Sequence, residues 1–244
     1  MSVGTKKVFR PRDDRDVVAL VDAWPLAWVV CGKPADFAAT PLPLQIRCDT
    51  QGRPVRLVGH FARSNPQVEQ LRQDPEALVL LLGPQGYISP SWFDDRSMAP
   101  TRNYTSAAFR VRIVLEDDPV TIRQRIEELV TAVEAHHPQP WRIEDMGERF
   151  ASLAQHVVGF HADILEMRAS FKLGQDERED VFADILAGLD ATGQHELVTW
   201  MEAQAGPERL ARVAAARKNS KAASRIAGQA TVAAKRAAGS ESPD

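Results

Sequence analysis

The chain has 244 residues, of which 44% are hydrophobic and 26% are charged, and its formal net charge at pH 7 is −3. A chain of this size can bury a sizeable core, and its charge excludes a nucleic-acid-binding polycation. Its two cysteines exclude a disulfide framework or an all-cysteine zinc site, so we expect a reduced, cytoplasmic protein. No run of about 18 apolar residues occurs, so we expect no membrane span.

Helical and extended patterns alternate along the chain. Asp13 or Asp14 can cap a first helix that ends at Trp24, because Pro25 follows. Residues 77–82 are apolar at every position, which predicts a strand that is buried on both faces, and the glycines of 83–86 predict a turn after it. The remaining strands are expected at 26–31, 37–47 (where Pro41 and Pro43 favour an edge), 55–61, 104–115 and 157–172, and the remaining helices at 67–73, 119–136, 144–155, 178–189 and 194–204.

The composition changes sharply after about Pro207. Residues 207–244 are rich in Ala, Lys, Arg and Ser, and they contain eight basic and three acidic residues. Such a segment cannot offset its ordering entropy, so we expect a tail of frayed helix or disorder after a folded domain at 1–206. Within that domain, the order of elements predicts an α+β fold with a mainly antiparallel sheet, flanking helices and a C-terminal helical extension. Many short strands joined by tight turns favour a small β-barrel.

The segment 59–67 joins a predicted strand to a predicted helix. Free backbone N–H groups and the helix dipole at such a junction favour an anion. His60, Arg63, Ser64 and Asn65 add side-chain donors, and the planar guanidinium of an arginine suits a phosphate group. The alternative is a surface arginine with a helix cap at Ser64 or Asn65.

Three further segments combine groups that a flavin can use. Residues 83–93 join glycines, hydroxyls and aromatic rings after a buried strand, which suits a flat aromatic ligand; the alternative is a loop whose aromatic rings plug one end of the core. In the segment 100–104, Asn103 can hydrogen-bond a ligand or simply begin a strand. In the segment 171–175, Lys172 can reach a phosphate or remain solvated at the surface.

Motifs of other site classes are missing from the sequence. No HExxH, P-loop, GxSxG or GxGxxG motif occurs, and no metal site is predicted. His156 and His161 lie five residues apart with no carboxylate placed to complete a triad. The sequence therefore gives no support for acid–base catalysis, and it does not decide whether the protein is an enzyme.

Five segments in this order resemble the PaiB-type family of FMN-binding negative transcriptional regulators. They correspond to family patterns written GHxARxNP, GPxxYxSPSW, PTxNY, PW and KxSQ. The chain departs from the family where Arg102 replaces a common Trp, Pro41 a His, Gly174 a Ser and Asp176 an Asn. The matching segments are 59–66, 83–92, 100–104, 140–141 and 172–175.

The resemblance implies a split β-barrel that binds FMN, in a homodimer with the flavin near the subunit boundary. It implies that His60, Arg63 and Asn65 face the ligand. It also implies that Tyr87, Ser89, Asn103 and Lys172 approach the same pocket.

Three functions are compatible with these implications. The first is a flavin-binding regulator whose control of transcription is indirect, because no DNA-binding motif occurs and only the basic tail could contact nucleic acid. The second is a flavin-dependent oxidoreductase acting on a small molecule. The third is a haem protein that resembles the piperazate synthases, with His60 as the axial ligand.

Overall fold

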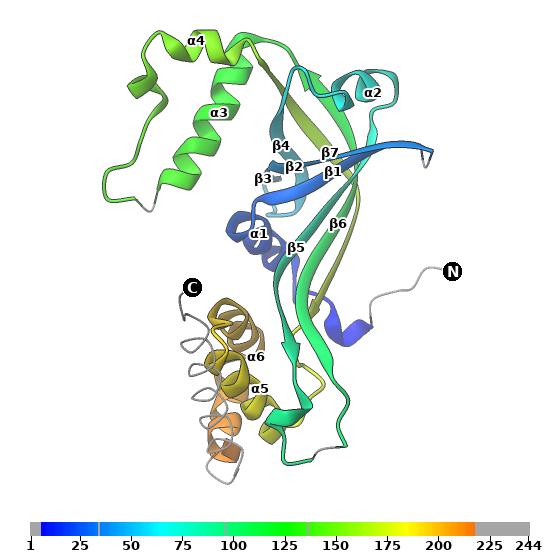
Figure 1. Ribbon diagram of the computed structural model, residues 1–244, viewed down its shortest axis with the longest axis vertical. Helices are drawn as coiled ribbons and strands as arrows, with labels where there is room; N and C mark the ends of the chain where they lie inside the picture. Colours follow the sequence, from blue (N-terminus) through cyan, green and yellow to red (C-terminus); the bar gives the residue numbers. More distant parts are fainter. Residues whose placement is uncertain (1–5, 34, 96, 136, 218–244) are drawn as a thin grey trace, which may run out of the picture. The chain divides into compact units, whose positions relative to one another are not determined.

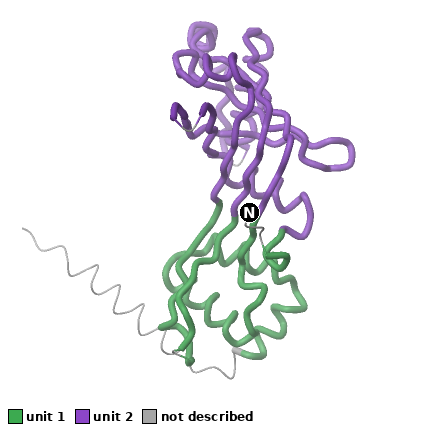
Figure 2. Tube along the Cα trace, turned by 90° about the vertical axis from the view of Figure 1, so that its right-hand side faces the viewer, with its two compact units in different colours: residues 1–10, 83–105, 170–244 green, residues 11–82, 106–169 purple. Residues whose placement is uncertain are grey.

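The computed structural model describes residues 6–33, 35–95, 97–135 and 137–217. The described chain divides into two compact units, which Figure 2 shows in different colours. Unit 1 takes residues up to Arg10, 83–105 and from Ser170, and unit 2 takes 11–82 and 106–169. Both units are discontinuous in sequence, a division that the sequence does not predict.

The strands form one seven-stranded sheet with the order β2-β1-β5-β6-β7-β4-β3 (Figure 1). The two ends of this order, β2 and β3, are consecutive in the chain and are joined by the buried Leu44. The sheet therefore curls without closing, and the predicted α+β split barrel is confirmed. The strands are β1 (Leu26–Lys33), β2 (Asp36–Pro43), β3 (Gln45–Cys48), β4 (Pro54–Ala62), β5 (Glu76–Ile88), β6 (Thr101–Glu116) and β7 (Val157–Lys172).

Two strand predictions need correction. The single strand expected at 37–47 is split into β2 and β3, and Pro41 and Pro43 lie on β2 at the edge of the sheet, where a missing N–H is tolerated. The turn expected at 83–86 is absent, because β5 runs through it. Gly86 is needed for close packing instead, since a Cβ there would lie 2.8 Å from Leu197 and 2.9 Å from Leu189.

Three helices pack on the sheet within unit 2. In α1 (Asp14–Ala23), the Asp13 side chain accepts a hydrogen bond from Arg15 N, as the predicted cap requires, and the helix contacts β3. The helix α2 (Gln67–Gln73) contacts β1, and α3 (Pro119–Glu134) contacts β4 (Figure 1). The helix expected at 144–155 is interrupted at Gly147, whose φ of 56° separates a 3₁₀ turn, η3 (Ile143–Met146), from α4 (Arg149–Ala154).

Unit 1 is built around α5 (Glu179–Ala191) and α6 (His195–Arg217), which pack against each other. Its smaller elements are η1 (Lys7–Phe9) and η2 (Pro90–Trp92). The ring of Trp92 lies against α5 at Gly188, where a Cβ would meet the ring at 2.2 Å. This contact requires a glycine, because any side chain would overlap the indole.

Of the two alternatives expected from Pro207, frayed helix or disorder, the first part of the tail is helical. Residues 207–217 continue α6 after a kink at Gly206, whose φ is 72°. Arg209 anchors this turn by donating to the carbonyl oxygens of Gly174 at 3.0 Å and Glu177 at 2.7 Å. Its guanidinium also lies 4.3 Å from the centre of the Phe182 ring. The rest of the predicted tail, 218–244, lies outside the described residues.

Candidate functional site

His60 lies on β4 in unit 2, directly opposite Gly159 of β7. Its Nδ1 atom is buried and has no hydrogen-bond partner within the described residues. Burial lowers the pKa of His60 below its ordinary value, so the ring is neutral at neutral pH. A neutral imidazole brings no positive charge to a phosphate, but it is the form that ligates a metal.

Arg63 is held in place by partners within unit 2. Its guanidinium pairs with Asp117 Oδ1 at 2.5 Å and donates to the carbonyl oxygens of Gln155 at 3.0 Å and Val157 at 2.8 Å. The hydrogen bond from Arg63 lowers the pKa of Asp117, so the carboxylate is ionised at neutral pH. A phosphate would have to displace Asp117 before Arg63 could bind it.

Ser64 and Asn65 lie between β4 and α2. Asn65 Oδ1 accepts a hydrogen bond from Gln67 N at 2.9 Å, and its Nδ2 donates to Thr40 Oγ1 at 2.9 Å. Asn65 thus caps the start of α2, which was the structural alternative for this segment. Ser64 is exposed.

The other four predicted site residues lie in unit 1. Lys172 Nζ donates to Thr101 Oγ1 across the ends of β7 and β6. Asn103 is buried on β6, and its Nδ2 contacts Met201 Sδ at 3.6 Å. Tyr87 is half exposed on β5, and Ser89 accepts a hydrogen bond from Ser91 N at the start of η2.

Polar side chains therefore gather on one face of β6 in unit 1. Thr101, Asn103 and Thr105 alternate along the strand, so they project from the same face, and Lys172 reaches the first of them. Thr105 is fully buried, and its Oγ1 has no partner within the described residues. A buried hydroxyl without a partner is costly and points to a missing polar contact.

The eight predicted side chains divide between the units. His60, Arg63, Ser64 and Asn65 belong to unit 2, whereas Tyr87, Ser89, Asn103 and Lys172 belong to unit 1. Among the described residues, the hydrogen bonds that join two of the predicted segments lie within unit 1, where Lys172 donates to Thr101 and Arg102 donates to Gln85. The convergence of all eight side chains on one flavin stays a prediction.

A histidine–carboxylate pair was missed from the sequence. His161 Nδ1 lies 2.7 Å from Glu116 Oε1, and Arg125 Nε donates to Glu116 Oε2 at 3.1 Å. The expectation that His161 has no carboxylate partner is therefore wrong. The partner is 45 residues away in sequence. The signal that could have found it is that Glu116 directly follows the strand expected at 104–115, while His161 lies in the strand expected at 157–172.

The new pair lies close to His60 in the register of the sheet. A Cβ built on Gly159, the residue opposite His60, would meet Glu116 at 3.5 Å. Burial raises the pKa of Glu116, but the hydrogen bonds from Arg125 and His161 outweigh burial and hold the pKa below the ordinary value. The carboxylate is thus ionised at neutral pH and can fix the orientation of the His161 ring.

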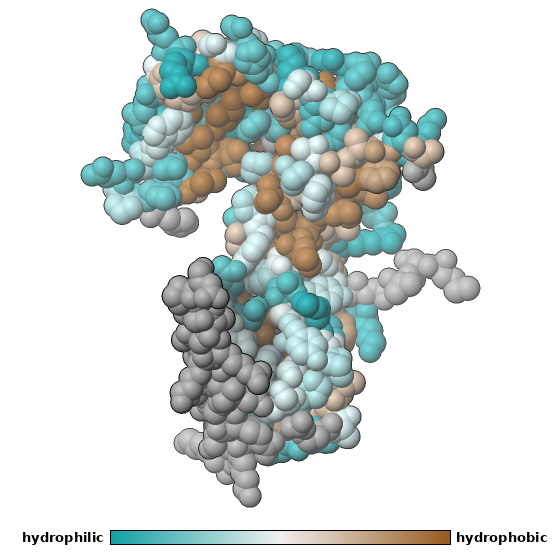
Figure 3. Space-filling model, in the orientation of Figure 1, coloured by the Kyte–Doolittle hydropathy of each residue, from teal (hydrophilic) through white to brown (hydrophobic). Residues whose placement is uncertain are grey.

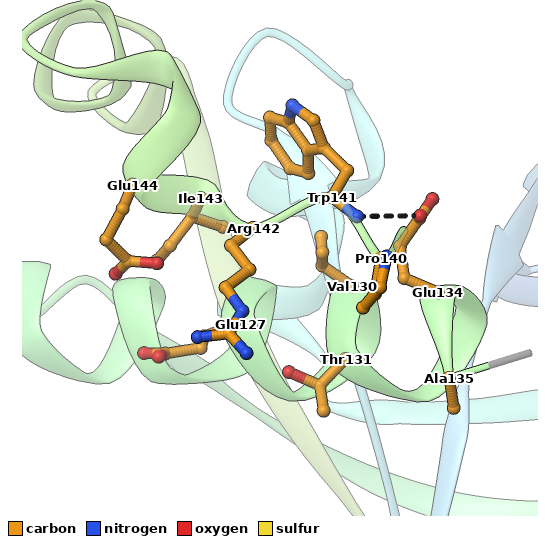
Figure 4. A pocket seen from close by; sticks show the side chains of 10 residues that line it. All are labelled: Glu127, Val130, Thr131, Glu134, Ala135, Pro140, Trp141, Arg142, Ile143 and Glu144. Carbon is orange, nitrogen blue, oxygen red and sulfur yellow. Dashed lines mark hydrogen bonds between the residues drawn. The ribbon is translucent and has the colours of Figure 1, made fainter. Parts of the chain in front are cut away.

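A pocket of about 460 Å³ lies in unit 2 between α3 and the segment 140–144 (Figure 4). Glu134 fixes this segment by accepting a hydrogen bond from Trp141 N at 3.0 Å, and the side chain of Arg142 points toward α3. The Pro140–Trp141 pair of the family resemblance lines this pocket, whereas none of the eight predicted site residues does.

The described residues contain neither a metal-binding cluster nor a membrane-spanning helix. No group of three or more His, Cys, Asp or Glu side chains is placed there to hold a metal ion. None of the described helices is both long enough and apolar enough to span a membrane.

Comparisons with known proteins agree with the sequence resemblance. Residues 5–166 match the family model described as "Putative FMN-binding domain". The chain is 28% identical over 160 residues to "Protease synthase and sporulation protein PAI 2" of Bacillus subtilis (strain 168), covering 65% of this chain and 73% of that protein. It is 26% identical over 100 residues to "Uncharacterized protein YKL070W" of Saccharomyces cerevisiae, covering 39% of this chain and 59% of that protein.

A solved structure shows the same fold at low identity. The conserved hypothetical protein Rv2991 from Mycobacterium tuberculosis matches with a TM-score of 0.50 at 11% identity, covering 70% of this chain and 93% of that chain. At this identity the likeness concerns the fold alone.

Proposed function

This chain belongs to the PaiB-type family of FMN-binding domains, and from that premise we propose that it binds FMN and acts as a flavin-dependent regulator whose effect on transcription is indirect. When bound, FMN supplies the redox chemistry. The protein's part is to hold and orient the flavin. The two cysteines are free thiols, as in the reducing cytoplasm where we place the protein.

The observation that carries this proposal is the polar face of β6 in unit 1. Lys172 supplies a cation beside the Thr101 hydroxyl, and a phosphate group takes both kinds of donor. Asn103 and the Thr105 hydroxyl, which has no hydrogen-bond partner among the described residues, offer buried polar atoms further along the same face. Arg63 suits the phosphate less well, because Asp117 already neutralises it.

Lys172→Ala is expected to weaken FMN binding by about 1.5–3 kcal/mol, the range for a hydrogen bond to a charged group. The dissociation constant should rise by roughly 10- to 150-fold, as measured by quenching of flavin fluorescence. Riboflavin, which lacks the phosphate, should bind the variant and the wild type equally.

Two control variants sharpen this test. Lys172→Arg keeps the charge and should retain most of the affinity for FMN. Arg63→Ala should leave the affinity for FMN unchanged and lower the stability of unit 2, because Arg63 pairs with Asp117. If Arg63→Ala weakens FMN binding and Lys172→Ala does not, the phosphate lies at the segment 59–67 instead.

The regulatory part of the proposal is tested by a gel shift with the full chain and with a chain that ends at Arg217. Neither is expected to bind duplex DNA at physiological salt, because the described residues contain no known DNA-binding motif and the basic tail is short. Specific binding by the full chain would contradict indirect control.

A haem-binding enzyme is the second candidate, and His60 is the observation that favours it. Its Nδ1 atom is buried and its imidazole is neutral, which is the form of an axial ligand. A Soret band that His60→Ala abolishes would support this candidate. A flavin spectrum whose bound flavin is reduced by a nicotinamide cofactor would support an oxidoreductase instead.

A further inference from the structure

One face of α3 forms the first wall of the pocket that Figure 4 shows. The residues of this wall recur at the spacing of neighbours on one side of a helix. They are Glu127, Val130, Thr131 and Glu134. Figure 3 shows hydrophobic side chains over α3, and Val130 contributes an apolar surface to the pocket. This wall therefore combines an apolar surface with two carboxylates and a hydroxyl.

The segment 140–144 forms the opposite wall, and both of its ends are tied to α3. At one end, Trp141 N donates a hydrogen bond to Glu134 at 3.0 Å. At the other end, Arg123 of α3 pairs with Glu144 at 2.7 Å. The pocket is therefore largely pre-formed, as small-molecule sites usually are. Its volume of about 460 Å³ is within the range of about 300–1,000 Å³ for such sites.

Two opposite charges face this pocket without neutralising each other. The side chain of Arg142 points from the segment 140–144 toward α3 (Figure 4), and it forms no ion pair with another described residue. On the facing wall, the carboxylate of Glu127 has no hydrogen-bond or ion-pair partner among the residues that the structure describes. Charged groups bind strongly to partners of opposite charge through charge-assisted hydrogen bonds. A ligand that carries both a carboxylate and an ammonium group would satisfy both side chains.

We propose that this pocket binds a zwitterionic amino acid with an aliphatic side chain. The carboxylate of the ligand accepts hydrogen bonds from the guanidinium of Arg142 and the hydroxyl of Thr131. Its ammonium group donates to Glu127, and its side chain packs on Val130 and Pro140.

Molecules with only one kind of charge suit the pocket less well. A ligand with a carboxylate alone faces the three glutamates of the lining, and a ligand with an ammonium group alone faces the guanidinium of Arg142. None of the eight residues predicted to hold FMN lines this pocket, so binding here does not depend on the flavin.

The test is isothermal titration calorimetry of the full-length protein with three probes of similar shape. L-Leucine carries both charges, L-leucinol lacks the carboxylate, and isocaproate lacks the ammonium group. L-Leucine is expected to bind, and the other two are expected to bind at least about 10-fold more weakly, because each leaves one charged side chain without a partner. Equal binding of L-leucinol or isocaproate, or no binding of L-leucine at millimolar concentration, would overturn the proposal.

Variants locate the site. Arg142→Gln and Glu127→Gln should each raise the dissociation constant for L-leucine by at least about 10-fold. Both side chains are exposed, so both variants should keep the thermal transition of the wild type.

Arg149→Gln is the matched control. Arg149 lies on α4, is exposed and does not line the pocket, so this variant should bind L-leucine as the wild type does. An equal loss of affinity in Arg149→Gln and Arg142→Gln, or unchanged affinity in Arg142→Gln, would contradict the site. FMN titration of the same samples reports on flavin binding separately, so a failed amino-acid site and a failed flavin site are distinguishable.

Discussion

Gly188→Ala is expected to destabilise unit 1 by at least about 2 kcal/mol, at the upper end for an overpacked site. A Cβ at this position would lie 2.2–2.7 Å from three atoms of the Trp92 indole, which is buried against α5. At an exposed helical position the same change stabilises by about 1 kcal/mol, because alanine is the better helix former. Helix propensity alone would raise the urea midpoint. A lowered midpoint therefore reports the clash with Trp92.

A double-mutant cycle checks the cause. Trp92→Leu removes the ring atoms that the new Cβ would meet, so Gly188→Ala should become neutral or stabilising in that background. Gly159→Ala serves as a comparison, because its Cβ would make ordinary contacts at 3.5 Å. An equal loss from Gly188→Ala with and without Trp92 would contradict the packing that we describe.

Glu116→Gln is expected to destabilise unit 2 by about 2–3 kcal/mol at pH 7, because a mostly buried carboxylate loses its charge while Arg125 keeps its own. Glu116 and Arg125 are 14% and 17% exposed in their side chains. The pKa of Glu116 is lowered in the folded state. Its stabilising effect is therefore complete above the unfolded pKa of glutamate and is lost as the pH falls through the folded pKa.

Urea unfolding of both proteins from pH 7 to pH 3 measures this effect. The difference in the free energy of unfolding between wild type and Glu116→Gln should shrink on acidification. At low pH the carboxyl group of Glu116 is protonated and therefore uncharged, like the amide of the variant. Asp190→Asn is the matched control: it removes the carboxylate of an exposed pair with His195 and should change stability by less than about 0.5 kcal/mol. A difference for Glu116→Gln that does not change with pH would show that its charge is not involved.

Much of the fold follows from local patterns. The helix α2 and the strand β7 have the predicted bounds, because each is a clear periodic segment bordered by residues that stop it. Local patterns mispredict secondary structure where a glycine is present because there is no room for a side chain. The sequence predicts a turn at Gly86, yet this residue lies within β5 and packs against Leu197 and Leu189. Only the tertiary structure distinguishes these two uses of glycine.

The start of the tail shows a second limit of local patterns. Composition correctly indicates that few large apolar side chains follow Pro207. It does not show that Arg209 stacks on Phe182 and caps two carbonyl groups, or that Val213 is buried. These contacts depend on segments that are distant in sequence. Composition alone therefore places the end of the ordered chain too early.

The candidate site was predicted in part. Residue types indicated which segments are polar; in the structure Lys172 donates to Thr101, and Asn103 lies two residues further along β6. The sequence could not show that Asn65 is used to cap α2 or that Arg63 is paired with Asp117. Nor could it join His161 to Glu116, since hydrogen bonds between strands depend on a register that a single sequence does not specify.

Flavin binding is tested most directly by the absorption spectrum of the full-length protein after incubation with excess FMN and removal of free ligand by gel filtration. We expect the flavin bands to elute with the protein at one FMN per chain, and to be lost selectively in Lys172→Ala. Protein that elutes without flavin, or with a Soret band alone, would contradict the account.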